Sequence, residues 1–150
     1  MSRIALTFGD PAGIGPEVVC KWLSAAAQEL AAAGQQIVLV GTPDTLRSGL
    51  QVAAKALNQQ GAQNSELSKL SDMPVVSKLS AVGNQPLSLL DTGVRFAESG
   101  SIRFGEVDAL YGAAAIESIE VAARACLAGD VDAMVTAPIN KESVNASGCA

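Results

Sequence analysis

The segment that most restricts the fold of this chain is residues 7–17, which read TFGDPAGIGPE. An apolar run at 4–6 precedes it, and an amphipathic run that begins at Val18 follows it. This order predicts a buried strand, a glycine-rich turn and the start of a helix. Pro16 suits the first helical position, where its missing N–H costs nothing. The segment therefore indicates an α/β fold.

The glycine-rich turn is also a candidate binding loop. Gly13 and Gly15 lack Cβ atoms, so the backbone there can approach a ligand closely or adopt a positive φ. The unpaired amides of the following helix favour an anionic group, although Glu17 in the first turn would compete with one. Asp10 can accept a hydrogen bond from a ribose or substrate hydroxyl, or it can fix the turn by bonding its own backbone. We expect Asp10, Gly13, Ile14 and Gly15 to form a cofactor-binding edge; the alternative is a tight connection without a ligand.

Two common phosphate-binding signatures are absent from this loop. A Rossmann fingerprint needs a third glycine where Val18 stands, and a P-loop needs a terminal Gly-Lys-Ser/Thr. The loop alone therefore does not identify its ligand.

The rest of the chain alternates helical and strand-like patterns, which predicts a mostly parallel sheet between helices. We expect strands at 3–8, 37–40 and 133–136, and helices at 16–33, 43–57 (with a break near Gly49) and 106–128. Thr42 and Asn140 fit helix N-caps, and Gly34 and Gly129 fit helix ends. Residues 58–86 are polar, and they predict an irregular excursion from the main sheet. Short strands are expected at 75–76 and 87–90.

A second candidate site follows the strand expected at 133–136. Ligands of open parallel sheets bind beyond the carboxyl ends of strands, so Thr136, Asn140 and Lys141 are predicted to bind substrate. If this strand lies beside the first one, both loops line one rim. Each residue also has a plain alternative: Thr136 as a strand end, Asn140 as a helix cap and Lys141 as a solvated surface lysine.

Composition excludes several classes of function. The net charge of −5 and the aromatic content of 3% argue against nucleic-acid binding. No apolar run reaches the ~20 residues that span a bilayer, and no signal peptide is recognisable, so we expect a cytoplasmic protein. Three widely spaced cysteines form no C-x-x-C pair, and histidine is absent. A histidine metal site, a Ser-His-Asp triad and a Cys-His dyad are therefore excluded within these residues.

Two motifs in this order carry a resemblance to a known family. Residues 7–17 and residues 132–142, DAMVTAPINKE, are similar to motifs of the 4-hydroxythreonine-4-phosphate dehydrogenases of pyridoxal phosphate biosynthesis. Gly100, Ser101, Ile102 and Gly105, followed by an alanine-rich helix, also resemble that family. The resemblance covers the whole chain but only the N-terminal part of the family's longer sequence.

The resemblance implies an α/β/α fold like that of isocitrate and isopropylmalate dehydrogenases. It implies NAD- or NADP-dependent oxidation of 4-phosphohydroxy-L-threonine with decarboxylation, assisted by a divalent metal (zinc, magnesium or cobalt) that histidines hold. It also implies a homodimer with its active site between subunits. The match stops before the first family histidine, so we expect residues 1–150 to be a single domain, an N-terminal fragment without catalytic or metal-binding residues.

Two further expectations and several alternatives follow. The fragment alone should be inactive, and it should self-associate through apolar faces that lack their covering elements.

A related dehydrogenase acting on threonate or erythronate phosphate would share both motifs. Two other classes remain open: a non-catalytic module that binds a phosphorylated ligand, and a purely structural or interaction domain.

Overall fold

A single parallel sheet forms the centre of the molecule. The computed structural model describes residues 2–60, 65–96 and 102–149. The strand order is β3-β4-β2-β1-β5, and every pairing is parallel. The strands are β1 (Ser2–Thr7), β2 (Gln35–Gly41), β3 (Val75–Val76), β4 (Leu87–Asp91) and β5 (Ala133–Thr136).

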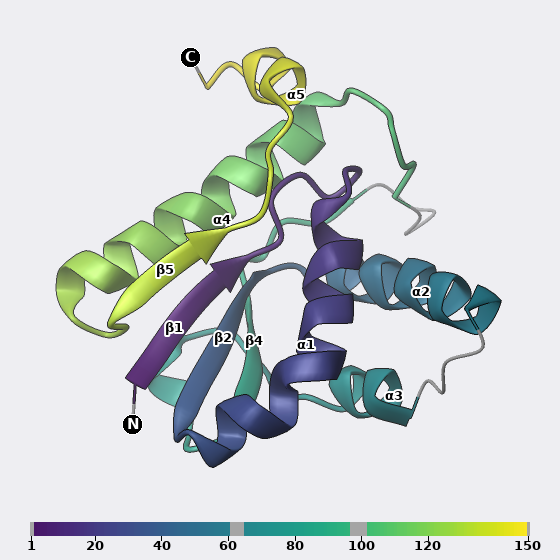
Figure 1. Cartoon of the computed structure of the whole chain (residues 1–150). Helices are drawn as coiled ribbons and strands as arrows, with labels where there is room; N and C mark the ends of the chain where they lie inside the picture. The colour runs from purple at the N-terminus through teal and green to yellow at the C-terminus, as the bar shows by residue number, and fades with distance from the viewer. Residues whose placement is uncertain (1, 61–64, 97–101, 150) are drawn as a thin grey trace.

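Helices cover the sheet on two sides, as Figure 1 shows. One side carries α1 (Gly15–Ala32), α2 (Pro43–Gln59) and α3 (Ser65–Ser71), and the other carries α4 (Ala109–Ala128). The short helix α5 (Lys141–Ala146) packs on the first turns of α4, and a 3₁₀ turn, η1, spans Leu79–Ala81. The expected α/β/α architecture is confirmed.

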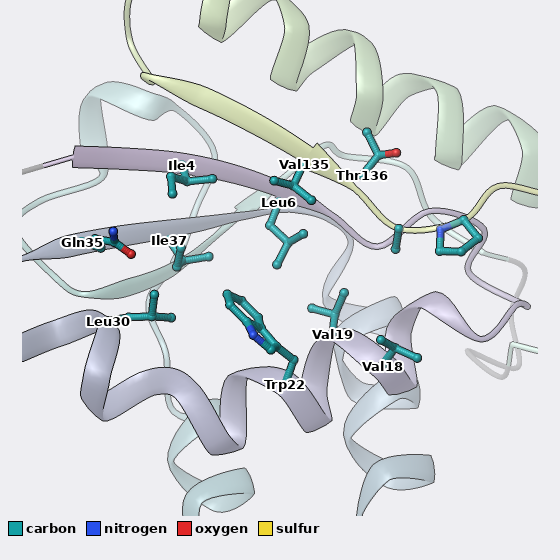
Figure 2. A pocket seen from close by; sticks show the side chains of 12 residues that line it. Ile4, Leu6, Val18, Val19, Trp22, Leu30, Gln35, Ile37, Val135 and Thr136 are labelled. Carbon is teal, nitrogen blue, oxygen red and sulfur yellow. The ribbon is translucent and has the colours of Figure 1, made fainter. Parts of the chain in front are cut away.

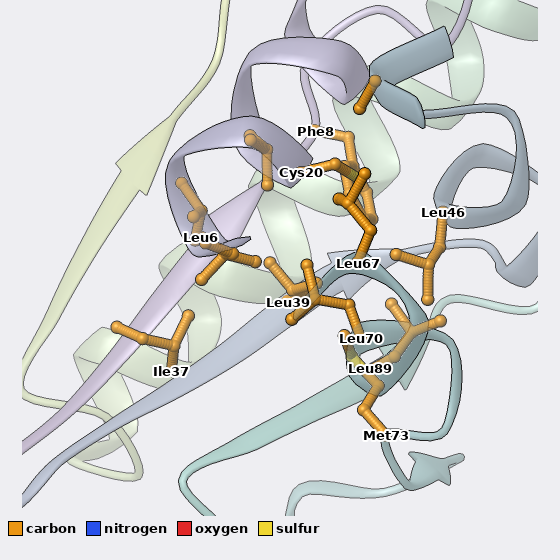
Figure 3. Close-up of a cluster of buried hydrophobic side chains, with 13 residues drawn as sticks. Leu6, Phe8, Cys20, Ile37, Leu39, Leu46, Leu67, Leu70, Met73 and Leu89 are labelled. Carbon is orange, nitrogen blue, oxygen red and sulfur yellow. The ribbon is translucent and has the colours of Figure 1, made fainter. Parts of the chain in front are cut away.

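The core lies in two layers because β2 is buried on both faces. Ile37 and Leu39 point toward α1 and α2, into a cluster with Leu6, Leu23 and Leu89 (Figure 3). The alternate residues of β2 pack with alanines of α4 on the opposite face. A continuous apolar run is typical of a strand that is covered on both sides.

The helix and strand ends confirm most of the predicted boundaries. Thr42 caps α2 by accepting from the Thr45 N–H at 3.1 Å, and Gly129 ends α4 with a φ of +77°. The start of α4 is later than predicted, at Ala109 rather than 106, because the Asp108 carboxylate accepts from the Leu110 N–H at 2.7 Å and caps the helix there.

Two predictions about the middle of the chain are wrong. Helix α2 runs unbroken through Gly49, where a Cβ would lie 2.7 Å from the carbonyl oxygen of Pro16. Glycine is therefore needed for the close crossing of α1 and α2, not for a break. Residues 58–86 contribute α3 and β3, and with β4 they extend the main sheet instead of leaving it. Helix α3 was missed because only Leu67 and Leu70 of its seven residues are buried.

Candidate functional site

The sheet has a topological switch point between β1 and β5. The chain leaves β1 through α1 on one face, and it reaches β5 from α4 on the opposite face. Crevices at the carboxyl ends of two such strands are the usual ligand sites of open α/β sheets. The loops after β1 and β5 therefore meet where a ligand is expected, which confirms that the two motif strands are neighbours.

Close backbone contacts hold these two loops together. The Asp10 N–H donates to the Pro138 carbonyl oxygen at 3.0 Å. Gly9 has a φ of +69°, and a Cβ there would overlap the same carbonyl oxygen. A Cβ on Gly15 would overlap the carbonyl oxygen of Phe8 and lie 3.0 Å from the Cβ of Ala137. The absence of side chains at Gly9 and Gly15 thus allows the loops after β1 and β5 to pack closely together.

A cavity of about 530 Å³ opens between the loops. Five of the predicted site residues line it together: Asp10, Gly13, Ile14, Asn140 and Lys141. Pro138, Ile139 and Glu142 complete the lining, and sequence reasoning did not single them out although they adjoin predicted residues. Gly15, beneath the loop, and Thr136, within β5, lie outside this lining.

Asp10 is 3% exposed and acts chiefly on its own loop. Its Oδ1 accepts from the Ala12 N–H at 2.7 Å, and its backbone carbonyl accepts from the Gly13 N–H at 3.1 Å. Its Oδ2 is buried and has no hydrogen-bond partner among the described residues. The carboxylate therefore fixes the turn, as one of the two sequence interpretations held.

Helix α1 begins directly after the lining residue Ile14, and it has no side-chain cap. Ile14 occupies the N-cap position, makes no capping side-chain bond and is 62% exposed. Glu17 does not block this end, because its carboxylate pairs with the Lys21 ammonium at 2.6 Å. Pro16 has no N–H, and the Val18 N–H already donates to the Ile14 carbonyl oxygen at 3.1 Å, so this end of α1 favours an anion chiefly through the helix dipole.

Helix α5 presents Asn140 and Lys141 on the opposite wall. The Asn140 Oδ1 accepts from the N–H groups of Glu142 at 2.9 Å and Ser143 at 3.2 Å. The cap leaves the amide N–H₂ group as the part of Asn140 that can donate to a ligand. Lys141 is exposed at the start of the helix. A Cβ on Gly112 would overlap the Ser143 carbonyl oxygen, so this glycine allows α5 to lie against α4.

The segment around Gly105 packs against the glycine-rich loop. The Gly105 N–H donates to the Ala12 carbonyl oxygen at 2.8 Å, and Ile102 packs with Ala12 and Tyr111. Gly100 and Ser101, which contributed to the resemblance, lie outside the described residues.

One charged pair at the same edge of the sheet escaped the sequence analysis. Asp91 ends β4, and its carboxylate accepts from the Arg95 guanidinium at 2.6 and 2.9 Å. The hydrogen bond from Arg95 lowers the pKa of Asp91, and a further bond from the Gly93 N–H also lowers it. An acidic residue directly after an apolar strand, four residues before an arginine, was the available signal.

The described residues contain no cluster of three histidine, cysteine, aspartate or glutamate side chains that would fit a metal ion.

Cys20 is buried under α2, and burial raises the pKa of its thiol to about 12, whereas Cys149 is exposed. No helix in the described part of the chain combines the length and the apolar character that a membrane crossing requires.

Comparison with known proteins identifies the family. A family model described as "Pyridoxal phosphate biosynthetic protein PdxA" matches residues 33–150. The chain belongs to the PdxA family. The second motif, residues 132–142, lies within the matched part of this PdxA-family chain.

Curated relatives and solved structures match the PdxA-family chain over almost its whole length. The 4-hydroxythreonine-4-phosphate dehydrogenase of Geobacter metallireducens is 34% identical over 150 residues, which covers 97% of this chain and 38% of that protein. The D-threonate 4-phosphate dehydrogenase of Pectobacterium atrosepticum is 37% identical over 149 residues, which covers 99% and 40%. A crystal structure of a 4-hydroxythreonine-4-phosphate dehydrogenase from Burkholderia phymatum has a TM-score of 0.75 and 27% identity, covering 99% and 39%. The chain thus spans about two fifths of the length of these proteins.

Proposed function

We propose that this chain is the N-terminal part of an NAD(P)-dependent dehydrogenase that oxidises a phosphorylated hydroxy acid, with 4-phosphohydroxy-L-threonine as the preferred substrate. The switch-point cavity carries the proposal, because it gathers residues of both family motifs at one place. The relatives' names support the reaction class. D-threonate 4-phosphate is the second candidate substrate, since relatives with that activity match equally well.

The nicotinamide cofactor, when bound, supplies the hydride acceptor. This chain's own residues fit one edge of a site for it or for the substrate phosphate. The uncapped start of α1 favours an anionic group through the helix dipole, and Ile14 offers an apolar contact in the cavity lining. Asp10 holds the loop in shape, Asn140 donates through its amide, and Lys141 supplies a positive charge.

The divalent metal that the family resemblance implies does not fit this part of the protein. The sequence has no histidine, and the described residues offer no ligand cluster. We therefore assign its ligands to the part of the full-length enzyme that this chain does not span, and we derive no step through it. The homodimer is a prediction from the resemblance, and sedimentation of the full-length enzyme tests it.

Backbone-amide NMR of the 150-residue chain tests the proposed site. Inorganic phosphate, NAD⁺ and NADP⁺ are added in turn, and shifts are expected at residues 13–18 and 138–142. Shifts confined to other parts of the chain, or none with any of the three, would contradict the proposal. Binding without any turnover by the full-length enzyme would favour the non-catalytic alternative instead.

Lys141→Ala provides the matched variant for this titration. Because an exposed ion pair contributes at most about 1 kcal/mol, the affinity for phosphate should fall roughly two- to fivefold. Lys55→Ala removes another exposed lysine, on α2, and should leave the affinity unchanged. Equal effects of both substitutions would remove Lys141 from the site.

A further inference from the structure

A second cavity, of about 450 Å³, lies on the face of the sheet that α1 covers. Its floor is formed by Ile4 and Leu6 of β1 and Val135 of β5, and its wall by Val18 and Trp22 of α1. Figure 2 shows Trp22 pointing from the helix toward the strand side chains across this space. Of the twelve residues that line it, only Gln35 and Thr136 are polar. We call this cavity the α1–β5 groove.

The groove is open because nothing described covers β5 on this side. Val135 is 53% exposed, although its neighbour in register, Leu6, is buried. β5 is also the last strand of the sheet, so its outer backbone groups have no strand partner among the described residues. Parallel strands are normally covered by helices on both faces. Among the described elements, α4 provides the main helical cover of β5.

The wall residues Val18 and Trp22 begin an exposed stripe on α1 that has the side-chain spacing of a helix–helix contact. Val18, Trp22, Ala25 and Glu29 are all exposed on α1, at intervals of four, three and four residues. Residues at these intervals form one stripe along a helix, and an apolar stripe of this kind packs against a neighbouring helix. The small Ala25 permits close approach, and Glu29 marks the end of the stripe with a negative charge.

The chain's relatives carry enough additional polypeptide to fill the groove. The match extends over almost the whole of this chain but over only about two fifths of each relative. We propose that the α1–β5 groove is the docking site of an amphipathic helix from that additional length, lying along α1, with a strand added to the free edge of β5. This inference concerns the completion of the fold, and it does not depend on the proposed activity.

A second copy of the chain fits the groove less well. Pairing two β5 edges about a two-fold axis would place the two α1 helices on the same face but separated by both β1 and both β5 strands. Strands lie about 4.8 Å apart and packed helices 8–10 Å apart. The two α1 stripes would therefore not meet, and Trp22 would stay exposed.

A chimera tests the proposal. This chain replaces the matched two fifths of the Pectobacterium atrosepticum dehydrogenase, and Trp22, the only tryptophan of the chain, reports on the groove. Its signal is assigned with Trp22→Phe. In the dilute isolated chain Trp22 should be quenched readily by acrylamide, and in the chimera it should be shielded with emission at shorter wavelength. An equally accessible Trp22 in the chimera, or a chimera that fails to fold, would overturn the proposal.

Two valines with the same exposure provide the matched variants. Val135 in β5 and Val75 in β3, at the opposite edge of the sheet, are both 53% exposed. Val135→Asp should leave the isolated chain as stable as before, but in the chimera it should expose Trp22 again and lower the melting temperature by several degrees. Val75→Asp should do neither. Equal effects of the two variants, or a dimer of the isolated chain that shields Trp22 while the chimera does not, would refute the helix assignment.

Discussion

The Asp10 N–H donates to the Pro138 carbonyl oxygen, and this hydrogen bond joins two loops whose residues are 128 positions apart. Its length of 3.0 Å leaves no room for a side chain on the adjacent Gly9. The two motifs of the sequence are thereby locked into a single rim at the switch point of the sheet.

Gly9→Ala should strongly destabilise the protein. Alanine at a φ of +69° costs roughly 1–2 kcal/mol, and its Cβ would also overlap the Pro138 carbonyl and lie 2.6 Å from that of Ala137. A total loss of about 3–5 kcal/mol in the free energy of unfolding is expected from urea titration. Gly34→Ala is the control: its φ is +65° with no atom within 4 Å of the new Cβ, so only the backbone cost should appear.

Gly49→Ala should destabilise the protein, although a change from glycine to alanine usually stabilises a helix. Replacing a helical glycine normally stabilises by about 0.5–1 kcal/mol. Here the new Cβ would lie 2.7 Å from the Pro16 carbonyl oxygen and 3.0 Å from the Cys20 sulfur, so α1 and α2 must separate. A loss of about 1–3 kcal/mol is expected in urea titration. A gain in stability would show that the two helices can separate without cost.

The Asp91–Arg95 pair should make stability depend on pH in the acid range. Because the pKa of Asp91 is lowered in the folded state, its contribution is fully present above the unfolded value of about 3.9 and is lost as pH falls through the lower folded value. Arg95→Gln should raise the pKa of Asp91 in an NMR titration. The pKa should not rise fully to the ordinary value of an aspartate, because the Gly93 N–H still donates to the Asp91 carboxylate at 2.9 Å.

The control for this titration is Lys69→Gln, which removes the partner of Glu66 in α3. It should leave the Asp91 titration unchanged. An Asp91 pKa that does not rise in Arg95→Gln would show that the guanidinium does not cause the shift. The stabilities of the wild type and Arg95→Gln should converge as pH falls below the folded pKa.

Cys20 and Cys149 should differ in their reaction with iodoacetamide. Burial raises the pKa of Cys20 to about 12, so at pH 8 its thiol is protonated and inaccessible. Cys149 is exposed and should be alkylated first. Mass spectrometry should find Cys20 modified only after unfolding in urea. Modification of Cys20 at the rate of Cys149 would mean that the α1–α2 layer opens in the native state.

Local features of the sequence were sufficient to predict most of the elements. Thr42 and Asn140 were recognised as caps because capping depends on side chains within three residues. Gly129 was recognised as a helix end for the same reason. Helix α3 was missed because a seven-residue helix with two buried leucines has too little periodicity to separate it from a polar loop.

The candidate site was predicted in part. Residues of both motifs were expected at one rim, and five of the seven line the cavity. Sequence reasoning could not tell a glycine that meets a ligand from one that meets backbone, as Gly15 does. Nor could it decide which of two roles Asp10 fills, since that depends on the distance to Ala12 and on burial by other loops.

The sequence by itself determined most of the succession of strands, turns and helices, α3 excepted, because caps, glycine stops and apolar periodicity act between neighbours along the chain. Only the tertiary structure decided that β5 lies beside β1, that β3 and β4 extend the sheet, and that Trp22 and Val135 face an open groove. Strand order and exposed faces arise from contacts between distant segments. No local pattern encodes which strands become partners.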